Sequence, residues 1–252
     1  IADLDTGDYS DACHAQWLDV ARKDYAHDVL EALGVDVAKL PTLRRGVDVA
    51  GRLTLESARQ LGLSSGIPVV AGGGDGACAT VGAGAVAAGT GYCCLGTTAW
   101  AACTAGQLVI DSEHRIFNIC NLDGETTMVL GTIQSACSSV NWVMDLLGET
   151  DLGRFNAEAA AVGAGSGGVV YLPYLEGERS PIWDPRARGV FFGLGVDHGR
   201  GHFFRAVLEG VGFALRSVVE ALREHQDFAL LRIIGGGAES KLWREILASQ
   251  FR

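Results

Sequence analysis

The chain has 252 residues, including 35 Gly and 5 Pro, and 48% of it is hydrophobic, a composition typical of a globular protein of one large or two modest domains. Its formal net charge of −10 and the lack of a Lys/Arg cluster argue against a nucleic-acid-binding surface. Glycines and polar residues interrupt every apolar run before it reaches membrane-spanning length, so no membrane segment is expected.

In the first third of the chain, apolar residues at helical spacing predict a helix over residues 11–33, which Gly34 would end. A loop with Pro41 follows, and then a short helix over residues 55–61. β-branched residues predict a strand over residues 68–73 that runs into three glycines.

The remaining two thirds predict paired strands followed by helices. The expected elements are a hairpin of strands 92–95 and 99–103, a strand pair 115–120 and 126–130, a helix 135–147, a short buried strand 169–172, a long helix 203–223, a strand 233–234 and a helix 239–250. This order predicts an α/β architecture. Within the long helix, Arg205 and Glu209 are one turn apart and are expected to form a structural ion pair.

Seven cysteines are spread along the chain, at positions 13, 78, 93, 94, 103, 120 and 137. They form no CxxC pair, and no His lies at metal-ligand spacing, so no metal site is predicted. An odd number of cysteines in mostly apolar settings indicates reduced, buried thiols in a cytoplasmic protein. Adjacent Cys93 and Cys94 fit a strand whose side chains alternate between its two faces.

Asp75 is the only charged residue between Gln60 and Ile110, and it directly follows Gly72-Gly73-Gly74. A segment with so little charge is expected to be buried core, where an unpaired carboxylate is costly. Glycines before the acid let a ligand approach the backbone closely. Asp75 is therefore a candidate catalytic residue, although a helix N-cap or a turn residue explains the same position.

Two strand–glycine–helix junctions lie at residues 72–74 and 235–237. At such a junction the backbone N–H groups and the helix dipole favour a phosphate, whereas close packing of helix on strand is the alternative reason for the glycines. No Gly-Lys-Ser/Thr phosphate loop occurs anywhere in the chain.

A relaxed dinucleotide fingerprint, Gly72-x-Gly74-x-x-Ala77, raises an NAD-dependent oxidoreductase as an alternative. That function needs an acidic residue about 20 residues later to bind the ribose. None occurs before Asp111, so the alternative is weak.

Several motifs follow one another along the chain. They are Asp5-Thr6-Gly7-Asp8-Tyr9-Ser10-Asp11-Ala12, Gly72-Gly73-Gly74-Asp75, Leu95-Gly96-Thr97-Thr98, Gly177-Glu178-Arg179-Ser180-Pro181, Arg205-Ala206-Val207-Leu208-Glu209-Gly210, and Gly235-Gly236-Gly237-Ala238-Glu239-Ser240-Lys241-Leu242-Trp243. Together and in this order they make the chain resemble the FGGY family of carbohydrate kinases, in particular its pentulose (xylulose) kinase branch. The resemblance spans nearly the whole chain.

The resemblance implies a two-lobed, ribonuclease-H-like (actin-like ATPase) fold. Residues 1–88 would be the end of the first, sugar-binding lobe, and residues 89–252 would be most of the second, ATP-binding lobe. The implied reaction is phosphorylation of a sugar hydroxyl by ATP with Mg²⁺. Asp75 would bind the sugar and act as general base.

The resemblance also implies a set of nucleotide-binding residues. They are Gly96, Thr97, Thr98, Ser138, Asn141, Gly236, Gly237, Ala238 and Lys241. We expect a small-molecule sugar as the partner, no nucleic acid and no membrane, with a homodimer left open.

Departures from the family pattern leave three points open. Family members are about twice as long and begin with an Asp-x-Gly-Thr phosphate loop, so we expect this chain to be a fragment, and a nucleotide-binding fragment without turnover is an alternative. Gly76 stands where xylulose kinases commonly carry Asn, which leaves the sugar undecided. Glu178 and Arg179 are expected to be a solvated pair, part of a substrate loop or a latch between lobes.

Overall fold

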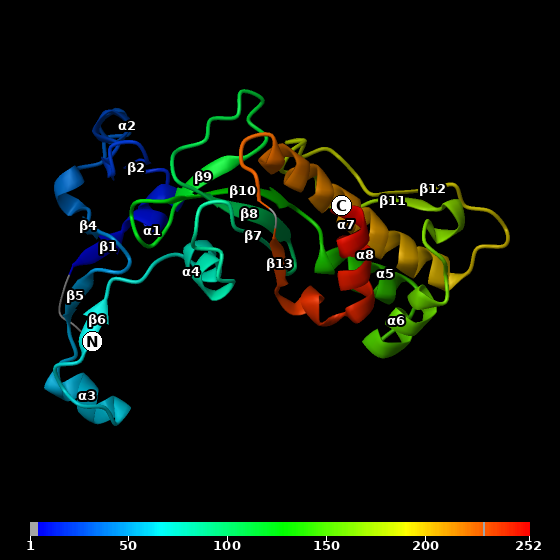
Figure 1. Ribbon diagram of the computed structural model, residues 1–252, viewed down its shortest axis with the longest axis horizontal. Coiled ribbons are helices and arrows are strands. Elements are labelled where there is room, and N and C mark those ends of the chain that lie inside the picture. Colours follow the sequence, from blue (N-terminus) through cyan, green and yellow to red (C-terminus); the bar gives the residue numbers. More distant parts are fainter. Residues whose placement is uncertain (1–4, 229) are drawn as a thin grey trace. The chain divides into compact units, whose positions relative to one another are not determined.

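The computed structural model describes residues 5–228 and 230–252 and is drawn as a ribbon in Figure 1. The chain forms two compact units. Unit 1 contains the described residues up to Ala88 together with Thr104–Val109 and Asn118–Met128, and unit 2 contains Gly89–Cys103, Ile110–Phe117 and Val129–Arg252. A lobe boundary at residue 88, as expected from the resemblance, stays a prediction.

Unit 1 is built from short elements. They are β1 (Thr6–Asp8), α1 (Tyr9–His14), β2 (Leu18–Asp19), β3 (Asp24–Tyr25), α2 (His27–Ala32), the 3₁₀ helix η1 (Val37–Lys39), β4 (Thr42–Arg44), β5 (Val49–Arg52), α3 (Leu55–Leu61), β6 (Pro68–Val70) and α4 (Asp75–Gly82). β1 pairs with β4 in parallel, whereas β2–β3 and β5–β6 are antiparallel pairs. A small core cluster consists of Ala12, Leu18, Tyr25, Leu30 and Cys120.

The single helix predicted over residues 11–33 is wrong, because α1 ends at His14 and α2 begins only at His27. Between them the chain forms the antiparallel pair β2–β3. Asp19 closes the turn of this pair: its Oδ1 accepts hydrogen bonds from the main-chain N–H groups two and three residues further on, both at 3.0 Å. An aspartate that binds the backbone after it competes with helix formation, and apolar spacing alone does not reveal this.

The long helix α7 (Arg200–Arg223) organises unit 2 and packs against α5, α6, α8 and β11 (Figure 1). The other helices are α5 (Cys137–Leu146), α6 (Leu152–Ala160), α8 (Lys241–Gln250) and the 3₁₀ helices η2 (Ser166–Gly168) and η3 (Gly236–Glu239). The remaining strands of the chain are β7 (Gly91–Leu95), β8 (Ala99–Ala105), β9 (Phe117–Cys120), β10 (Thr127–Ile133), β11 (Val170–Leu172), β12 (Val190–Phe192) and β13 (Leu231–Ile234).

A five-stranded sheet has the order β13-β7-β8-β10-β9. β7 runs parallel to β13 and antiparallel to β8, and β11 and β12 form a separate antiparallel pair. The predicted hairpin is confirmed, with Leu95 opposite Ala99 across the turn. Helix α6 is absent from the predicted elements. It begins after Asp151, whose Oδ1 accepts the Arg154 N–H at 2.9 Å.

The nearly uncharged segment 60–110 is only partly buried. β7 and β8 are buried except for Cys94 and Trp100, which are half-buried, as expected of strands inside a sheet. Val70 of β6, in contrast, keeps 53% of its surface exposed. β6 belongs to a two-stranded sheet, so a lack of charge did not suffice to predict burial there.

The strand predicted to be buried over residues 169–172 is buried only in part, because Val170 and Leu172 of β11 are exposed and Tyr171 is buried.

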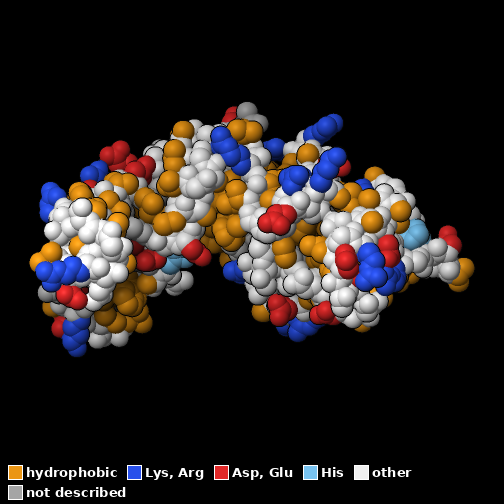
Figure 2. Space-filling model, turned by 90° about the horizontal axis from the view of Figure 1, so that it is seen from below, with side chains coloured by type: hydrophobic (Ala, Val, Ile, Leu, Met, Phe, Trp, Pro, Cys, Tyr) orange, Lys and Arg blue, Asp and Glu red, His pale blue; other side chains and the backbone are white. Residues whose placement is uncertain are grey.

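The surface of the described residues is mixed in character. On the face drawn in Figure 2, Lys and Arg side chains form small separate groups beside acidic ones. All seven cysteines are free, and Cys78 is exposed, so the expectation of buried thiols fails at that position. None of the helices in the described ranges is long and apolar enough to cross a membrane.

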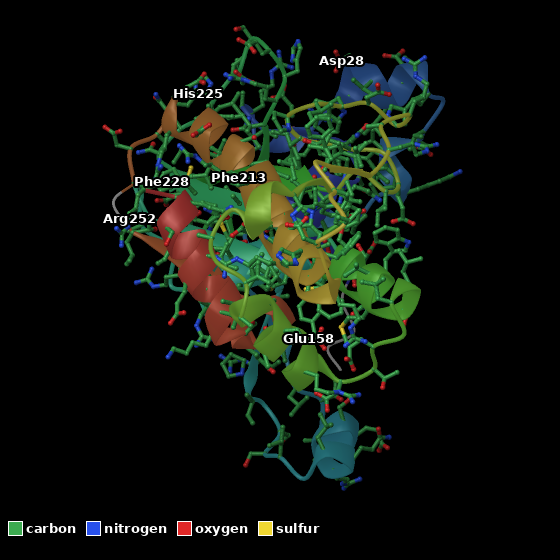
Figure 3. The ribbon with its side chains drawn as sticks, turned by 90° about the vertical axis from the view of Figure 1, so that its right-hand side faces the viewer. Asp28, Glu158, Phe213, His225, Phe228 and Arg252 are labelled. Carbon is green, nitrogen blue, oxygen red and sulfur yellow. The ribbon has the colours of Figure 1, made fainter. Side chains whose placement is uncertain are left out.

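An ion-pair network in unit 2 is centred on Glu149, whose side chain is 2% exposed. Its Oε1 accepts the N–H groups of Thr150 and Asp151, both at 2.9 Å. Its Oε2 lies 2.7 Å from the Arg200 guanidinium, which also pairs with Glu158 on α6, labelled in Figure 3. The main-chain N–H bonds, that of Asp151 foremost, and Arg200 lower the pKa of Glu149 to about 2.

We expect Glu149→Gln to lower the melting temperature at pH 7, and the difference from wild type to shrink as the pH falls from about 4.5 to about 2. A carboxylate whose pKa is depressed by folding stabilises the protein above its unfolded pKa and loses this effect as the pH falls through its folded pKa. Thermal unfolding between pH 2 and pH 7 measures the change. Glu245→Gln, in an exposed pair with Lys241 at 3.7 Å, is the control and should change little. A difference that is independent of pH would contradict the prediction.

Candidate active site

The glycine turn before Asp75 lies in unit 1, where three segments approach closely. Gly72 has a φ of +80° and donates its N–H to the Gly46 carbonyl at 3.0 Å. A Cβ atom at Gly73 would lie 2.7 Å from the Ser10 hydroxyl oxygen and would collide with Leu122. The first glycines of the turn are therefore required by backbone conformation and by close packing.

A buried carboxylate on the neighbouring segment anchors this turn. The Gly74 N–H donates to Ser10 Oγ at 2.9 Å, and the Ser10 hydroxyl in turn donates to Asp8 Oδ1. Asp8 is 5% exposed and is the N-cap of α1, where it also accepts the Ser10 N–H at 2.7 Å. One side-chain relay thus joins the start of α1 to the residue directly before Asp75.

Asp75 is the first residue of α4 and is exposed, so its predicted burial is wrong. The N-cap of α4 is Gly74, which excludes the alternative that Asp75 serves as the cap. Asp75 Oδ1 accepts the Gly76 N–H at 2.7 Å. Burial, and then the charges of Asp8 and Asp75, raise the pKa of neighbouring Asp11. The result is an exposed carboxylate on a firmly held stretch of backbone, open to a ligand from solvent.

The dinucleotide fingerprint around Gly72 lacks the structural context that it requires. A Rossmann-type phosphate turn follows a strand of a parallel sheet. β6 instead pairs antiparallel with β5 in a two-stranded sheet. The arrangement around Gly72 gives the NAD-dependent alternative no support.

In unit 2, the first turn of α5 holds the hairpin turn of residues 96–98. The N–H groups of residues 136–138 donate to the carbonyls of Gly96 and Thr97 at 3.0 to 3.2 Å, and the Ser138 hydroxyl donates to the Thr97 carbonyl at 3.0 Å. Thr97 is exposed and Thr98 is half-buried, and neither hydroxyl is engaged by the described residues. The turn is therefore fixed through its carbonyls, which leaves its two hydroxyls available to a ligand.

Beside this turn lies a cavity of about 470 Å³. Its walls include Asn141 of α5, Asn156 of α6, Gly236 and Gly237 of η3, and Trp243 of α8. Its volume is in the range of small-molecule binding pockets. The cavity is mostly apolar, with a few polar groups, as expected for a site that binds an aromatic, partly polar ligand.

The two glycines at positions 236 and 237 have different roles. A Cβ atom at Gly237 would lie 2.8 Å from Leu95 Cβ and 2.9 Å from Trp243 Cζ3, so this glycine lets η3 pack on the end of β7. At Gly236 no atom lies within 4 Å of the Cβ position, so this glycine leaves the cavity open. Both reasons considered for glycine-rich junctions, close packing and ligand access, therefore occur side by side.

Three residues of the expected nucleotide set, Ser138, Ala238 and Lys241, lie neither in the cavity lining nor in the turn of residues 96–98. The Lys241 side chain is 82% exposed and pairs with Glu245 at 3.7 Å, and the Ala238 carbonyl accepts a hydrogen bond from Arg244. Ser138 contacts the hairpin turn instead of the cavity.

Sequence reasoning missed the α6 side of the cavity. Asn156 of α6 accepts a hydrogen bond from the Ser240 hydroxyl at 2.6 Å, and Phe155 packs against Phe204 with ring centroids 4.6 Å apart. The capping residue Asp151 and the alanines at positions 157, 159 and 160 were local signals for α6.

No group of three or more His, Cys, Asp and Glu side chains that could hold a metal ion occurs in the described part of the chain. Mg²⁺ in phosphoryl-transfer sites is usually held by one or two carboxylates together with substrate phosphates and water. The residues present are compatible with a metal ion that arrives with the nucleotide phosphates.

Comparison with known proteins gives matches along nearly the whole chain. The profile of the FGGY family of carbohydrate kinases matches with its N-terminal domain at residues 2–82 and with its C-terminal domain at residues 84–252. Xylulose kinase from Escherichia coli (strain K12) is 36% identical over 96% of this chain and 50% of that protein. Gluconokinase from Bacillus subtilis (strain 168) is 29% identical over 97% of this chain and 50% of that protein.

Solved structures of similar proteins support the same relationship. A protein described as a xyloylose kinase from Brucella ovis has a TM-score of 0.93 and 30% identity, covering 100% of this chain and 52% of that one. Xylulose kinase from Rhodospirillum rubrum has a TM-score of 0.85 and 28% identity, covering 98% of this chain and 51% of that one. These likenesses confirm the predicted fold class, and the chain spans about half the length of the curated relatives that it matches.

We expect Gly237→Ala to lower the free energy of unfolding by about 1–3 kcal/mol, because its new methyl group overpacks against Leu95 and Trp243. Gly236→Ala meets open space and should change it by no more than about 0.5 kcal/mol. Urea unfolding of the two variants measures both values. Equal losses at the two positions would show that the difference in packing has no energetic consequence.

Proposed function

Because the chain belongs to the FGGY family of carbohydrate kinases, we propose that it carries the nucleotide pocket and the catalytic carboxylate of an enzyme that transfers a phosphoryl group from ATP to a sugar hydroxyl. The observation that carries this proposal is the cavity of about 470 Å³ beside the turn of residues 96–98. An apolar cavity next to a turn with available hydroxyls suits a ligand that has an aromatic base at one end and phosphates at the other.

In this proposal the adenosine part of ATP occupies the cavity against Gly236. The phosphates extend to the turn of residues 96–98, where the hydroxyls of Thr97 and Thr98 donate hydrogen bonds to phosphate oxygens. Mg²⁺, bound to the same phosphates, would neutralise part of their charge. Asn141 and Asn156, both on the cavity wall, offer amide groups to the polar edges of the nucleoside.

Asp75 acts as general base in this proposal. Its carboxylate accepts the proton of the sugar hydroxyl while the hydroxyl oxygen attacks the γ-phosphorus and ADP leaves. Phosphoryl transfer depends mainly on positioning, and the Asp8–Ser10–Gly74 relay supports the backbone that carries Asp75. Exposure of Asp75 is consistent with a group that meets its substrate from solvent.

The sugar that we propose is a pentulose such as xylulose. Xylulose kinases are the more similar of the two kinds of relative given above, at 36% against 29% identity for the gluconokinase. A phosphorylation assay with xylulose, gluconate and glycerol separates these substrates. Turnover that is faster with gluconate than with xylulose would reject the pentulose.

We expect Gly236→Val to weaken MgADP binding by at least about tenfold, because Gly236 lines the cavity and no protein atom lies within 4 Å of its Cβ position. Isothermal titration calorimetry of MgADP into both proteins measures the loss. Val86→Ala, at a half-exposed residue of unit 1, is the control and should bind as wild type does. If wild type binds no adenine nucleotide, the proposed nucleotide pocket is wrong.

We expect Asp75→Asn to lower the rate of sugar phosphorylation by about 100- to 10,000-fold, the usual contribution of a general base, with MgADP binding unchanged. A coupled assay of ADP release measures the rate. Phosphorylation at the wild-type rate would remove Asp75 from the chemistry. Nucleotide binding by wild type without any turnover would favour the alternative of a nucleotide-binding module.

A further inference from the structure

Glu178 is a buried glutamate that the proposed chemistry does not use. It is 4% exposed, and its Oε1 accepts the main-chain N–H groups of Gln134 at 2.6 Å and of Arg179 at 2.7 Å. Its Oε2 is buried and has no hydrogen-bond partner among the described residues. Of the three alternatives that the sequence left open for Glu178 and Arg179, the solvated pair is therefore wrong, because the Glu178 carboxylate lies inside the protein.

A buried carboxylate with hydrogen bonds to only one of its two oxygens contributes little to the stability of a fold, because the other oxygen has lost its water without gaining a partner. Burial raises the pKa of Glu178, and the two N–H bonds and the charge of Arg179 offset this only in part. Tyr174 is a further titratable group that interacts with Glu178. Burial, and then the charge of Glu178, raise the pKa of Tyr174. An uncharged side chain would avoid the desolvation cost, so the position of this acid needs a reason beyond stability.

The loop that carries Glu178 is firmly held. Gly177 has a φ of +82°, and a Cβ atom there would lie 2.8 Å from the backbone of Pro185. The Glu178 N–H donates to the Asp184 carbonyl at 2.9 Å, which closes the loop on itself. The Ser180 N–H donates to the carbonyl of Thr132 in β10, also at 2.9 Å, and docks the loop on that strand. Glu178 is thus presented from a rigid support.

The backbone group that Glu178 binds lies at the entrance to α5. Gln134 directly follows β10. Two residues later comes Ala136, the first of the three residues whose N–H groups hold the turn of residues 96–98. The contacts form one path within unit 2. They run from the loop of residues 177–185 through the Glu178 carboxylate to Gln134, and from there through the first turn of α5 to the carbonyls of Gly96 and Thr97.

We infer that Glu178 is a positioning residue for the phosphate-binding turn: by holding the Gln134 N–H it fixes the start of α5, and thereby the Thr97 and Thr98 hydroxyls that meet the nucleotide phosphates. This inference rests on the proposed function, because it assigns Glu178 to the phosphate half of the same pocket. The inference predicts that Glu178 contributes to binding of the phosphates but not to binding of the adenosine.

The test compares dissociation constants for MgADP and adenosine, measured by calorimetry at pH 7. Glu178→Asp keeps the charge but withdraws the carboxylate from Gln134, and we expect about tenfold weaker MgADP binding with unchanged adenosine binding. Glu178→Gln keeps the reach with a neutral acceptor, and we expect MgADP binding to stay within about threefold of wild type. A folded Glu178→Asp protein with the wild-type ratio of the two constants overturns the inference.

Glu149 provides a matched control, since it is also buried in unit 2 and also accepts two main-chain N–H groups through Oε1. It lies before α6, on the adenosine side of the cavity. Glu149→Asp should therefore leave the ratio of MgADP to adenosine affinity unchanged, whatever it does to stability. A wild-type chain that binds neither ligand refutes the proposed function, whereas binding of both with an unaffected Glu178→Asp refutes only this inference.

Amide hydrogen exchange supplies a second measurement if Glu178→Asp does not fold. In Glu178→Gln the weaker acceptor should speed exchange of the amides of Gln134 and residues 136–138, but not those of Thr150 and Asp151. Equal exchange in wild type and variant across residues 134–138 overturns the inference.

Discussion

The hydrogen bonds between the first turn of α5 and the carbonyls of Gly96 and Thr97 are the constraint on which unit 2 depends. A helix start has N–H groups without partners inside the helix, and a hairpin turn has carbonyls in the same condition. Joining the two satisfies both and fixes α5 against the end of β7. The same helix then forms a wall of the cavity, and Gly237 brings η3 onto the end of β7 from the other side.

The glycine turn of unit 1 is also held by hydrogen bonds, but these involve side chains. There the glycine turn receives its support from a side-chain relay, in which Ser10 connects the Gly74 N–H to the buried carboxylate of Asp8. The two glycine triplets look alike in sequence but differ in structure. The first passes directly into the α-helix α4, and the second into the 3₁₀ helix η3 before α8 begins.

Long helices and strands that are rich in apolar residues could be predicted from the sequence. α7 is long and largely apolar, with residues 206–212 buried on every side, and the β7–β8 hairpin combines apolar strands with a short turn, so local pattern and tertiary context agree. The break at Asp19 and the exposure of Asp75 could not be predicted, because each depends on a contact or a solvent boundary that spacing does not encode. For the site, the family resemblance predicted Gly236 and Asn141, which line the cavity, whereas Asn156 and the burial of Glu178 became visible only in the structure.

The pKa values of the two buried glutamates of unit 2, Glu149 and Glu178, are shifted in opposite directions from the ordinary value of a glutamate. The pKa of Glu149 is lowered to about 2 by N–H donors and Arg200, whereas burial raises the pKa of Glu178. On acidification Glu178 becomes neutral first, while Glu149 keeps its charge and its ion pair with Arg200 over a further range of pH. The two carboxylates therefore lose their charge at different pH values as the solution is acidified, that of Glu178 before that of Glu149.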